Sequence, residues 1–217
     1  MLKKYNHNKK TDSCMRKLIL SIAFLCFGFL GFSQQDAQFT QNMFNKLSVN
    51  PASAGHNGGF CGTLLSRSQW IGFSGRPQTH MFSGDGRIGK HGIGLTVFQD
   101  QLGIEKSFIA KAAYSYHLLG IGPGELGIGI DIGIMNKSFG TDFVAYDDYL
   151  QDPSIPNAST SATSFDASFG LYYEIKETLY AGISTLHITQ SSFEDSVDGG
   201  GDGALNFKQA RHYYIMG

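Results

Sequence analysis

Apolar residues alternate with small or polar residues over most of the chain from Phe60 onward. Such alternation sends neighbouring side chains to opposite faces of an extended strand. In the clearest run, Leu126 to Ile134, every second residue is Leu or Ile, and the residues between them are Gly or Asp. One face of this strand is therefore apolar and the other is nearly bare. The same alternation occurs at Phe108 to Leu118 and at Phe165 to Ile175.

These runs approach the roughly 9–11 residues with which a tilted strand crosses a bilayer, and they are about twice as long as strands of soluble proteins. Weaker alternation predicts further strands at Gly59 to Ser68, Thr79 to Arg87, Gly92 to Gln99 and Leu179 to Ile188, and one that begins at Arg211. We see no helical stripe and no second domain.

The connections between the predicted strands differ in length. Short turns are indicated at Gly89 to Gly92, Gly120 to Gly124 and Lys176-Glu177, whereas Asp142 to Thr163 and Ser191 to Gln209 are long polar segments. Short turns at one end and long loops at the other are typical of outer-membrane barrels.

The two faces predict an all-β fold, an antiparallel transmembrane β-barrel of the outer-membrane type. Its apolar side chains would face lipid, and its small and acidic residues, such as Asp131, Asp166 and Glu174, would face a wet lumen. The alternative is a β-sandwich, which buries its apolar faces against each other. The Gly-rich second face favours the barrel.

A basic start from Lys3 to Lys17 precedes the apolar run Leu18 to Phe32, which ends in small residues before Gln34. This is the order of parts in a secretory signal peptide, and the run is short of the roughly 20 residues of a membrane-spanning helix. We expect a cleaved signal peptide at 1–33, an N-terminal segment at 34–58 and the barrel at 59–217. Met15 is an alternative start of translation.

Composition narrows the function classes. Charged residues make up 16% of the chain, with 28 Gly and 13% aromatic residues, and soluble domains carry roughly 25% charged residues. Six of the 17 Lys and Arg but one of the 18 Asp and Glu lie in the leader, which leaves a net charge of about −6. Nucleic-acid binding is therefore disfavoured. Cys61 alone follows the leader, which excludes an internal disulfide and a zinc site built on thiolates.

No residue pattern predicts catalysis, a cofactor or a metal site. The histidines of the predicted strands and turns lack the spacing of metal ligands, and they are His80, His91, His117, His187 and His212. Ser115 and His117 share one strand face, as in some membrane-embedded hydrolases, but the sequence offers no third member and no oxyanion hole. We interpret the pair as polar residues of the lumen.

Two loops and two aromatic groups each allow a functional interpretation and a purely structural one. Asp198 to Gly203 is rich in Gly and Asp but lacks the spacing of a calcium loop, so we expect a solvated loop, as for Asp147-Asp148. Trp70 with Phe73, and Tyr172-Tyr173 with Tyr180, are predicted to belong to aromatic girdles at the membrane interfaces. The alternative is packing inside a soluble core.

Several blocks of sequence resemble one known family. They are Gln34 to Gly55, with its Asn50-Pro51-Ala-Ser-Ala-Gly55 end, Arg67 to Thr79, which contains Gln-Trp70-Ile-Gly-Phe73, Gly92 to Val97, Asp100 to Gly103, and Arg211 to Gly217. Together they resemble the PorP/SprF family of the type IX secretion system and gliding-motility machinery. The resemblance covers essentially the whole chain after the leader.

The resemblance implies a non-enzymatic barrel of the outer membrane whose partners are membrane lipid, the secretion machinery and an exported adhesin or other secreted protein. A general diffusion channel is the alternative function. The family's barrels are larger than the strands counted here, and Gly217 ends within a predicted strand. Because an open sheet would leave unpaired edges in lipid, we expect a barrel truncated at its C-terminal end, or else a smaller barrel closed by residues 34–217.

The segment Gln34 to Gly55 allows two interpretations that the sequence does not rank. It is either a strand-free leader to the barrel or a periplasmic or lumenal segment in which Asn50-Pro51 fixes a turn.

Overall fold

The computed structural model describes residues 42–140, 160–176, 178–194 and 206–217. All of them belong to one compact unit, Ala37–Gly217. The predicted signal peptide, the Asp147-Asp148 pair and the Asp198 to Gly203 loop lie outside the described residues. Within the described ranges no helix has the length and apolar character required to cross a membrane.

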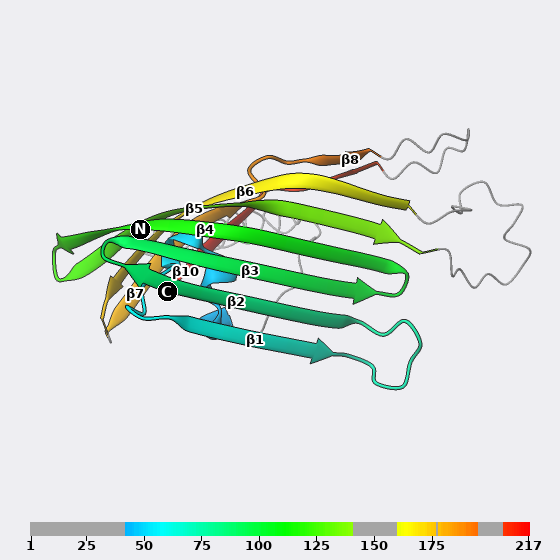
Figure 1. Cartoon of the computed structure of the whole chain (residues 1–217), viewed down its shortest axis with the longest axis horizontal. Coiled ribbons are helices and arrows are strands. Elements are labelled where there is room, and N and C mark those ends of the chain that lie inside the picture. The colour runs from blue at the N-terminus through cyan, green and yellow to red at the C-terminus, as the bar shows by residue number, and fades with distance from the viewer. Residues whose placement is uncertain (1–41, 141–159, 177, 195–205) are drawn as a thin grey trace, which may run out of the picture. The chain divides into compact units, whose positions relative to one another are not determined.

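Eight antiparallel strands form one sheet in the order β1-β2-β3-β4-β5-β6-β7-β10 (Figure 1). Their bounds are β1 Cys61–Ser68, β2 Gln78–Ile88, β3 His91–Leu102, β4 Glu105–Ile121, β5 Gly124–Phe139, β6 Thr160–Ile175, β7 Leu179–Leu186 and β10 His212–Met216. A separate two-stranded ribbon is made by β8 Ser192–Glu194 and β9 Asn206–Lys208. Three single 3-10 turns precede the sheet: η1 Asn42–Phe44, η2 Lys46–Ser48 and η3 Pro51–Ser53.

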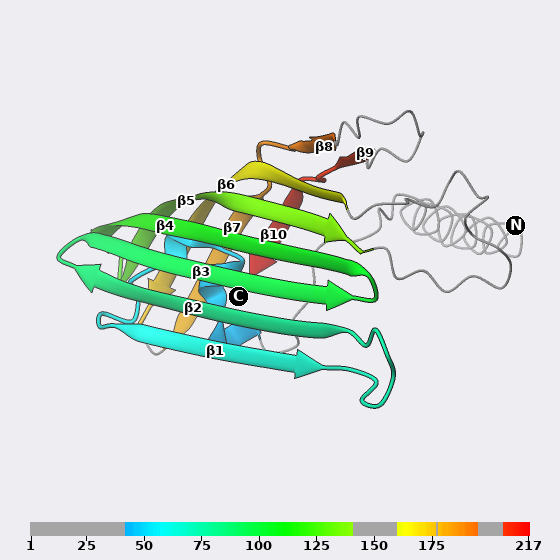
Figure 2. The same cartoon turned by 45° about the vertical axis from the view of Figure 1, so that its right-hand side comes forward.

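The sheet curls around the 3-10 turns. In both views β1 to β6 form a curved wall, β7 and β10 continue the curl behind it, and the blue segment lies between them (Figures 1 and 2). Contacts of η2 with β2 and β3, and of η3 with β4, β5 and β6, agree with this arrangement. Within the described ranges β1 and β10 each pair with one neighbour, so the curl is not closed.

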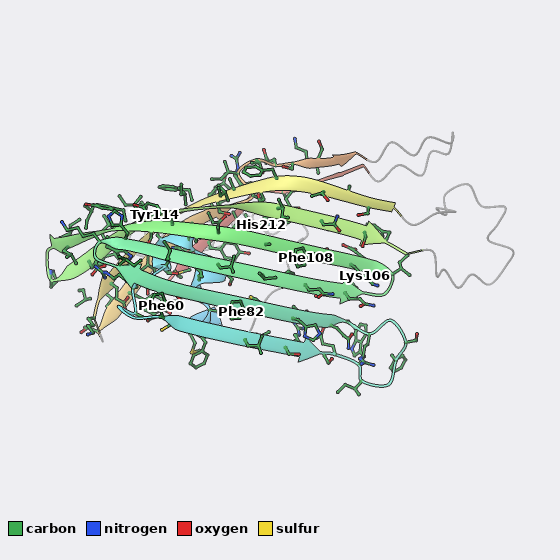
Figure 3. All side chains as sticks on the ribbon, in the orientation of Figure 1. Phe60, Phe82, Lys106, Phe108, Tyr114 and His212 are labelled. Atoms are coloured by element: carbon green, nitrogen blue, oxygen red, sulfur yellow. The ribbon has the colours of Figure 1, made fainter. Side chains whose placement is uncertain are left out.

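The faces of the wall are arranged as in a membrane barrel. On β5, Ile128, Ile130, Ile132 and Ile134 are exposed, whereas Asp131 between them is 5% exposed. Phe82, Phe108 and Tyr114 on β2 and β4 are likewise exposed on the sheet (Figure 3). Apolar side chains outside and polar side chains inside reverse the order of a soluble β-sandwich. The predicted all-β barrel architecture is confirmed, and the sandwich alternative is wrong.

Three strands are longer than the alternating pattern indicated. β4, β5 and β6 contain 17, 16 and 16 residues. Several of their extra residues are polar, and Glu105, at the start of β4, is paired with Lys137 near the end of β5 at 2.6 Å. The backbone ladder continues where hydrophobic alternation stops, so the predicted strands did not include these ends, and the start of β6 was placed in the Asp142 to Thr163 segment. The strands exceed the roughly 9–11 residues needed in lipid and therefore extend beyond it.

The connections also follow the predicted order, with two differences. Short turns join β2 to β3, β4 to β5 and β6 to β7, and longer connections join β1 to β2, β5 to β6 and β7 to β10. At the long-loop end, however, β3 and β4 are joined by the short Gly103-Ile104 turn. The ribbon of β8 and β9 was also missed, because its strands have three residues each within a polar region.

Glycines on the inner face create the space that the 3-10 segment fills. A Cβ atom at Gly92 would overlap the Ala54 carbonyl oxygen, and one at Gly129 would overlap the backbone of Ala52. Four further glycines face the segment in the same way: Gly94, Gly127, Gly170 and Gly182. The expectation of a wet lumen is therefore wrong at these positions, because the chain's own segment covers them.

Gly129→Ala tests this packing. We expect its methyl group to displace the segment, because the nearest backbone atoms of Ala52 leave no room for a Cβ. Displacement of the segment would be measured as faster tryptic cleavage after Lys46 in the refolded protein. Gly62→Ala on β1, where nothing lies within 4 Å of a Cβ, is the control and should stay protected. Equal protection in both variants would contradict the packing argument.

Candidate functional site: the lumenal segment and the polar wall behind it

Residues 45–56, called the lumenal segment below, are held to the wall mainly through Asn50. The Asn50 side chain is fully buried. Its Oδ1 accepts a hydrogen bond from the Ala52 N–H at 3.0 Å and caps η3, as Pro51 begins that turn. Its Nδ2 donates to the carbonyl oxygens of Leu171 at 3.0 Å and Ile183 at 3.4 Å. One amide therefore shapes the turn and attaches it to β6 and β7.

The first turn of the lumenal segment is attached to β2 and to a pair of tyrosines. Asn45 accepts a hydrogen bond from Ser83 Oγ at 2.7 Å. Lys46 Nζ donates to the Tyr172 hydroxyl at 2.7 Å and lies 3.8 Å from the ring centre of Tyr180, a cation–π contact. Tyr172 is fully buried on the inner face. Its predicted place in an outer aromatic girdle is therefore wrong.

The last turn of the lumenal segment is held by its backbone. The Gly55 N–H donates to Asp85 Oδ2 at 2.7 Å, and the Ala54 carbonyl oxygen accepts from Ser115 Oγ at 2.6 Å. His117 Nε2 lies 2.8 Å from the same carbonyl oxygen. Together with Asn50, these contacts join the segment to β2, β4, β6 and β7. Of the two interpretations left open by the sequence, the structure shows a lumenal segment for these residues.

Ser115 and His117 are brought together as the sequence predicted for residues on one strand face. Ser115 Oγ lies 2.9 Å from His117 Nε2, and His117 Nδ1 lies 2.5 Å from Glu125 Oε1. This order of hydroxyl, imidazole and carboxylate has the connectivity of a nucleophilic triad, including a third member that the sequence did not reveal.

The hydrogen bonds argue against nucleophilic chemistry at this triad. The Ala54 carbonyl oxygen can only accept, so His117 Nε2 carries its proton and cannot act as the base for Ser115. Ser115 already donates its own proton to that carbonyl oxygen. Both side chains are fully buried beneath the segment. The arrangement orients His117 and fastens Ala54.

His56 ends the lumenal segment and contacts aromatic rings on the wall. Its ring centre lies 4.5 Å from that of His117 and 4.5 Å from that of Tyr172. Neither ring nitrogen has a hydrogen-bond partner within the described residues, and both are buried. Burial, followed by the charges of His117, Arg87 and Lys46, lowers the pKa of His56 to about 3 against the opposing effect of the nearby Ala52 backbone, so the ring is neutral.

A second polar cluster lies further along the inner face, centred on Lys111. Lys111 Nζ is 2.6 Å from Asp166 Oδ2 and 3.7 Å from Asp131 Oδ1, and it donates to Ser168 Oγ at 3.2 Å. His187 Nδ1 is 2.7 Å from Asp166 Oδ2. These residues come from β4, β5, β6 and the position directly after β7. Asp131 and Asp166 face inward as predicted, but they are paired rather than simply solvated.

The remaining predicted residues do not assemble into a common site. His80 is exposed on β2 and contacts Ser66. His91, at the start of β3, contacts Tyr114 of β4. His212 lies against His187, with ring centres 5.5 Å apart. Trp70 and Phe73 are exposed in the loop between β1 and β2; their place at a membrane interface stays a prediction.

Sequence reasoning missed two residues that matter here, His56 and Glu125. The spacing of His56 and His117, 61 positions apart, carries no local signal, because only the folding of the segment onto β4 brings the two rings together. Asn50-Pro51 did signal a turn. The sequence offered no indication that the turn docks on the glycine face.

A curled antiparallel sheet with an apolar outer face, a polar inner face and a segment of its own in the lumen defines a β-barrel membrane protein of the outer-membrane type. The chain belongs to the family described as type IX secretion system membrane protein PorP/SprF, whose model matches residues 31–217. Comparison with curated proteins finds no match, and comparison with solved structures finds none. The resemblance read from the sequence is thus confirmed, and the family and fold indicate an outer-membrane location.

Asn50→Ala should release the lumenal segment. The change removes bonds to three backbone groups and leaves buried polar atoms unpaired, at an expected cost of roughly 2–4 kcal/mol. Tryptic cleavage after Lys46 should rise roughly 30-fold or more, since about 2 kcal/mol changes a population by that factor. Asn57→Ala, at an exposed residue, is the matched control. The same cleavage rate in both variants would show that Asn50 does not hold the segment.

Asp166→Asn should destabilise the wall itself. It leaves the buried charge of Lys111 and the ring of His187 without their nearest carboxylate, a loss of roughly 3 kcal/mol or more. Glu105→Gln breaks the more exposed pair with Lys137 and should cost less than about 1 kcal/mol. Urea unfolding in lipid vesicles measures both. A smaller loss for Asp166→Asn than for Glu105→Gln would refute the central role of the Lys111 cluster.

Proposed function

We propose that this type IX secretion component supports the export or surface attachment of secreted proteins, such as adhesins, as a structural partner of the machinery. Its expected partners are outer-membrane lipid, other proteins of the secretion machinery and the exported protein. Residues 1–33 act in this proposal as a cleaved signal peptide that directs the chain to the outer membrane. Mass spectrometry of the mature N-terminus tests the cleavage.

The observation that carries the proposal is the occupied inner face. Five consecutive residues of the lumenal segment, 51–55, are buried against the wall, and the ion pairs of Lys111 lie on the same face. A passage for general solutes requires an open, hydrated lumen. Packing of this kind suits a wall that presents a fixed surface to protein partners.

A general diffusion channel is the rival function, favoured by the polar character of the inner face. A cavity of about 130 Å³ also lies beside the segment, lined by residues that include Asp85 and Glu174. Loss of the first function would reduce protein secretion, whereas loss of the second would reduce solute uptake.

A deletion strain separates them. We expect loss of secreted and surface-attached proteins, measured by quantitative mass spectrometry, with unchanged uptake of small hydrophilic solutes. Complementation with the wild-type chain should restore secretion, and so should the Asn57→Ala control. Reduced solute uptake with intact secretion would overturn the proposal in favour of the channel. Steady conductance of vesicles containing the wild-type protein would also favour the channel.

A further inference from the structure

Three potential metal ligands meet where the lumenal segment ends. One ligand atom each from His56, His117 and Glu125 lies within 4.8 Å of the other two. His56 follows η3, His117 belongs to β4 and Glu125 to β5. The pairing of His117 with Gly127 puts Glu125 two residues away on the same face of the neighbouring strand. Segment and wall therefore both contribute to one cluster.

His117 is oriented as metal-binding histidines are. Its Nε2 donates to the Ala54 carbonyl oxygen at 2.8 Å, which leaves Nδ1 directed to the cluster. A metal-bound histidine usually donates its other ring N–H to a carbonyl or carboxylate in this way. Nδ1 lies 2.5 Å from Glu125 Oε1, yet it forms no hydrogen bond.

His56 supplies the second, independent indication. Both of its ring nitrogens are buried without a hydrogen-bond partner in the described part of the chain. Leaving a buried polar group unpaired costs roughly 1–3 kcal/mol. The ring is also given space: a Cβ at Gly127 would lie 2.7 Å from His56 Cε1. An imidazole without a hydrogen-bond partner, facing another imidazole and a carboxylate, matches the surroundings of a bound cation.

We propose that His56, His117 and Glu125 bind a divalent transition-metal ion, with Zn²⁺ as the representative species. Two imidazoles and one carboxylate, with a fourth position left to water, form a common zinc ligand set. Ligands of tetrahedral zinc are roughly 3.4 Å apart for bonds of about 2.1 Å. Side-chain shifts of the order of 1 Å bring the three atoms to that spacing. The cavity that His56 lines provides access for the ion and for water.

Arg87 limits the affinity of this site. Its Nη1 lies 2.6 Å from Glu125 Oε1, so metal and guanidinium share one carboxylate. We therefore expect moderate affinity in the wild type and tighter binding in Arg87→Gln, which removes the competing positive charge.

Binding of the ion would cross-link the lumenal segment to the wall. The ion would join the end of the lumenal segment to β4 and β5, beside the short β4–β5 turn. The competing account is a simple ion pair between a charged His117 and Glu125. That account requires no metal and leaves the two nitrogens of His56 unexplained.

The test uses the full chain, without a polyhistidine tag, purified in detergent and treated with a chelator. Titration with Co²⁺ should give the visible absorption of a four-coordinate ion at one equivalent, displaced by Zn²⁺. His56→Phe keeps a ring against Tyr172 but loses the ligand, and should bind at least about ten-fold more weakly. His80→Phe, at the exposed histidine of β2, is the matched control and should bind as the wild type does.

Protease protection links the ion to the segment. Zn²⁺ should slow tryptic cleavage after Lys46 in the wild type and in His80→Phe but not in His56→Phe, and a chelator should reverse the protection. Absence of saturable binding, or equal affinity in His56→Phe and the wild type, would overturn the proposal. If His56→Phe does not fold, X-ray absorption of the Zn²⁺-loaded wild type decides: imidazole ligands support the site, and oxygen ligands alone refute it. None of these measurements depends on which protein is exported.

Discussion

Close approach between the lumenal segment and the strand glycines is the constraint on which the rest of this structure depends. Side chains on the inner faces of β3, β5, β6 and β7 are reduced to hydrogen at Gly92, Gly129, Gly170 and Gly182, so that the backbone of the segment can reach the sheet. At this distance the polar groups of the segment meet those of the wall directly. Asn50, Ala54 and Gly55 then take partners from four different strands.

Two clusters of buried polar and charged side chains flank the contact between the lumenal segment and the sheet. Lys111 and its carboxylates lie on the side of the long loops, and Arg87, His117 and Glu125 lie on the side of the short turns. If side chains alone filled the lumen, the inward positions of the strands would need large residues. Here the backbone of the lumenal segment fills the space, so the strand positions that face it must be small. The polar residues that remain must pair with one another, because burial without a partner is costly. Accordingly, Glu125, Asp131 and Asp166 each lie beside a basic side chain on the described part of the inner face.

The strands could be predicted from the sequence because alternation is a local property. Each alternating run corresponds to a strand of the sheet, and the apolar members face outward as expected. The ends of β4 and β5 could not be predicted, since Glu105 and Lys137 are polar residues whose strand conformation depends on their cross-strand partners. The alternation itself places Tyr172 on the inner face, in phase with Asp166 and Ser168, so its assignment to an outer aromatic girdle conflicted with the pattern. The site was the least predictable part, because His56 meets His117 and Glu125 only after the segment has folded back onto the sheet.

The glycine positions have a consequence for how the wall assembles. Side chains alternate along each strand, so a slip of one residue in pairing exchanges its two faces. On β5 such a slip would bring Ile128 or Ile130 beneath the segment in place of Gly127 or Gly129, and the backbone of Ala52 would find no room. The lumenal segment can therefore dock only when neighbouring strands are paired in the native register. Its docking selects this register over pairings shifted by one residue.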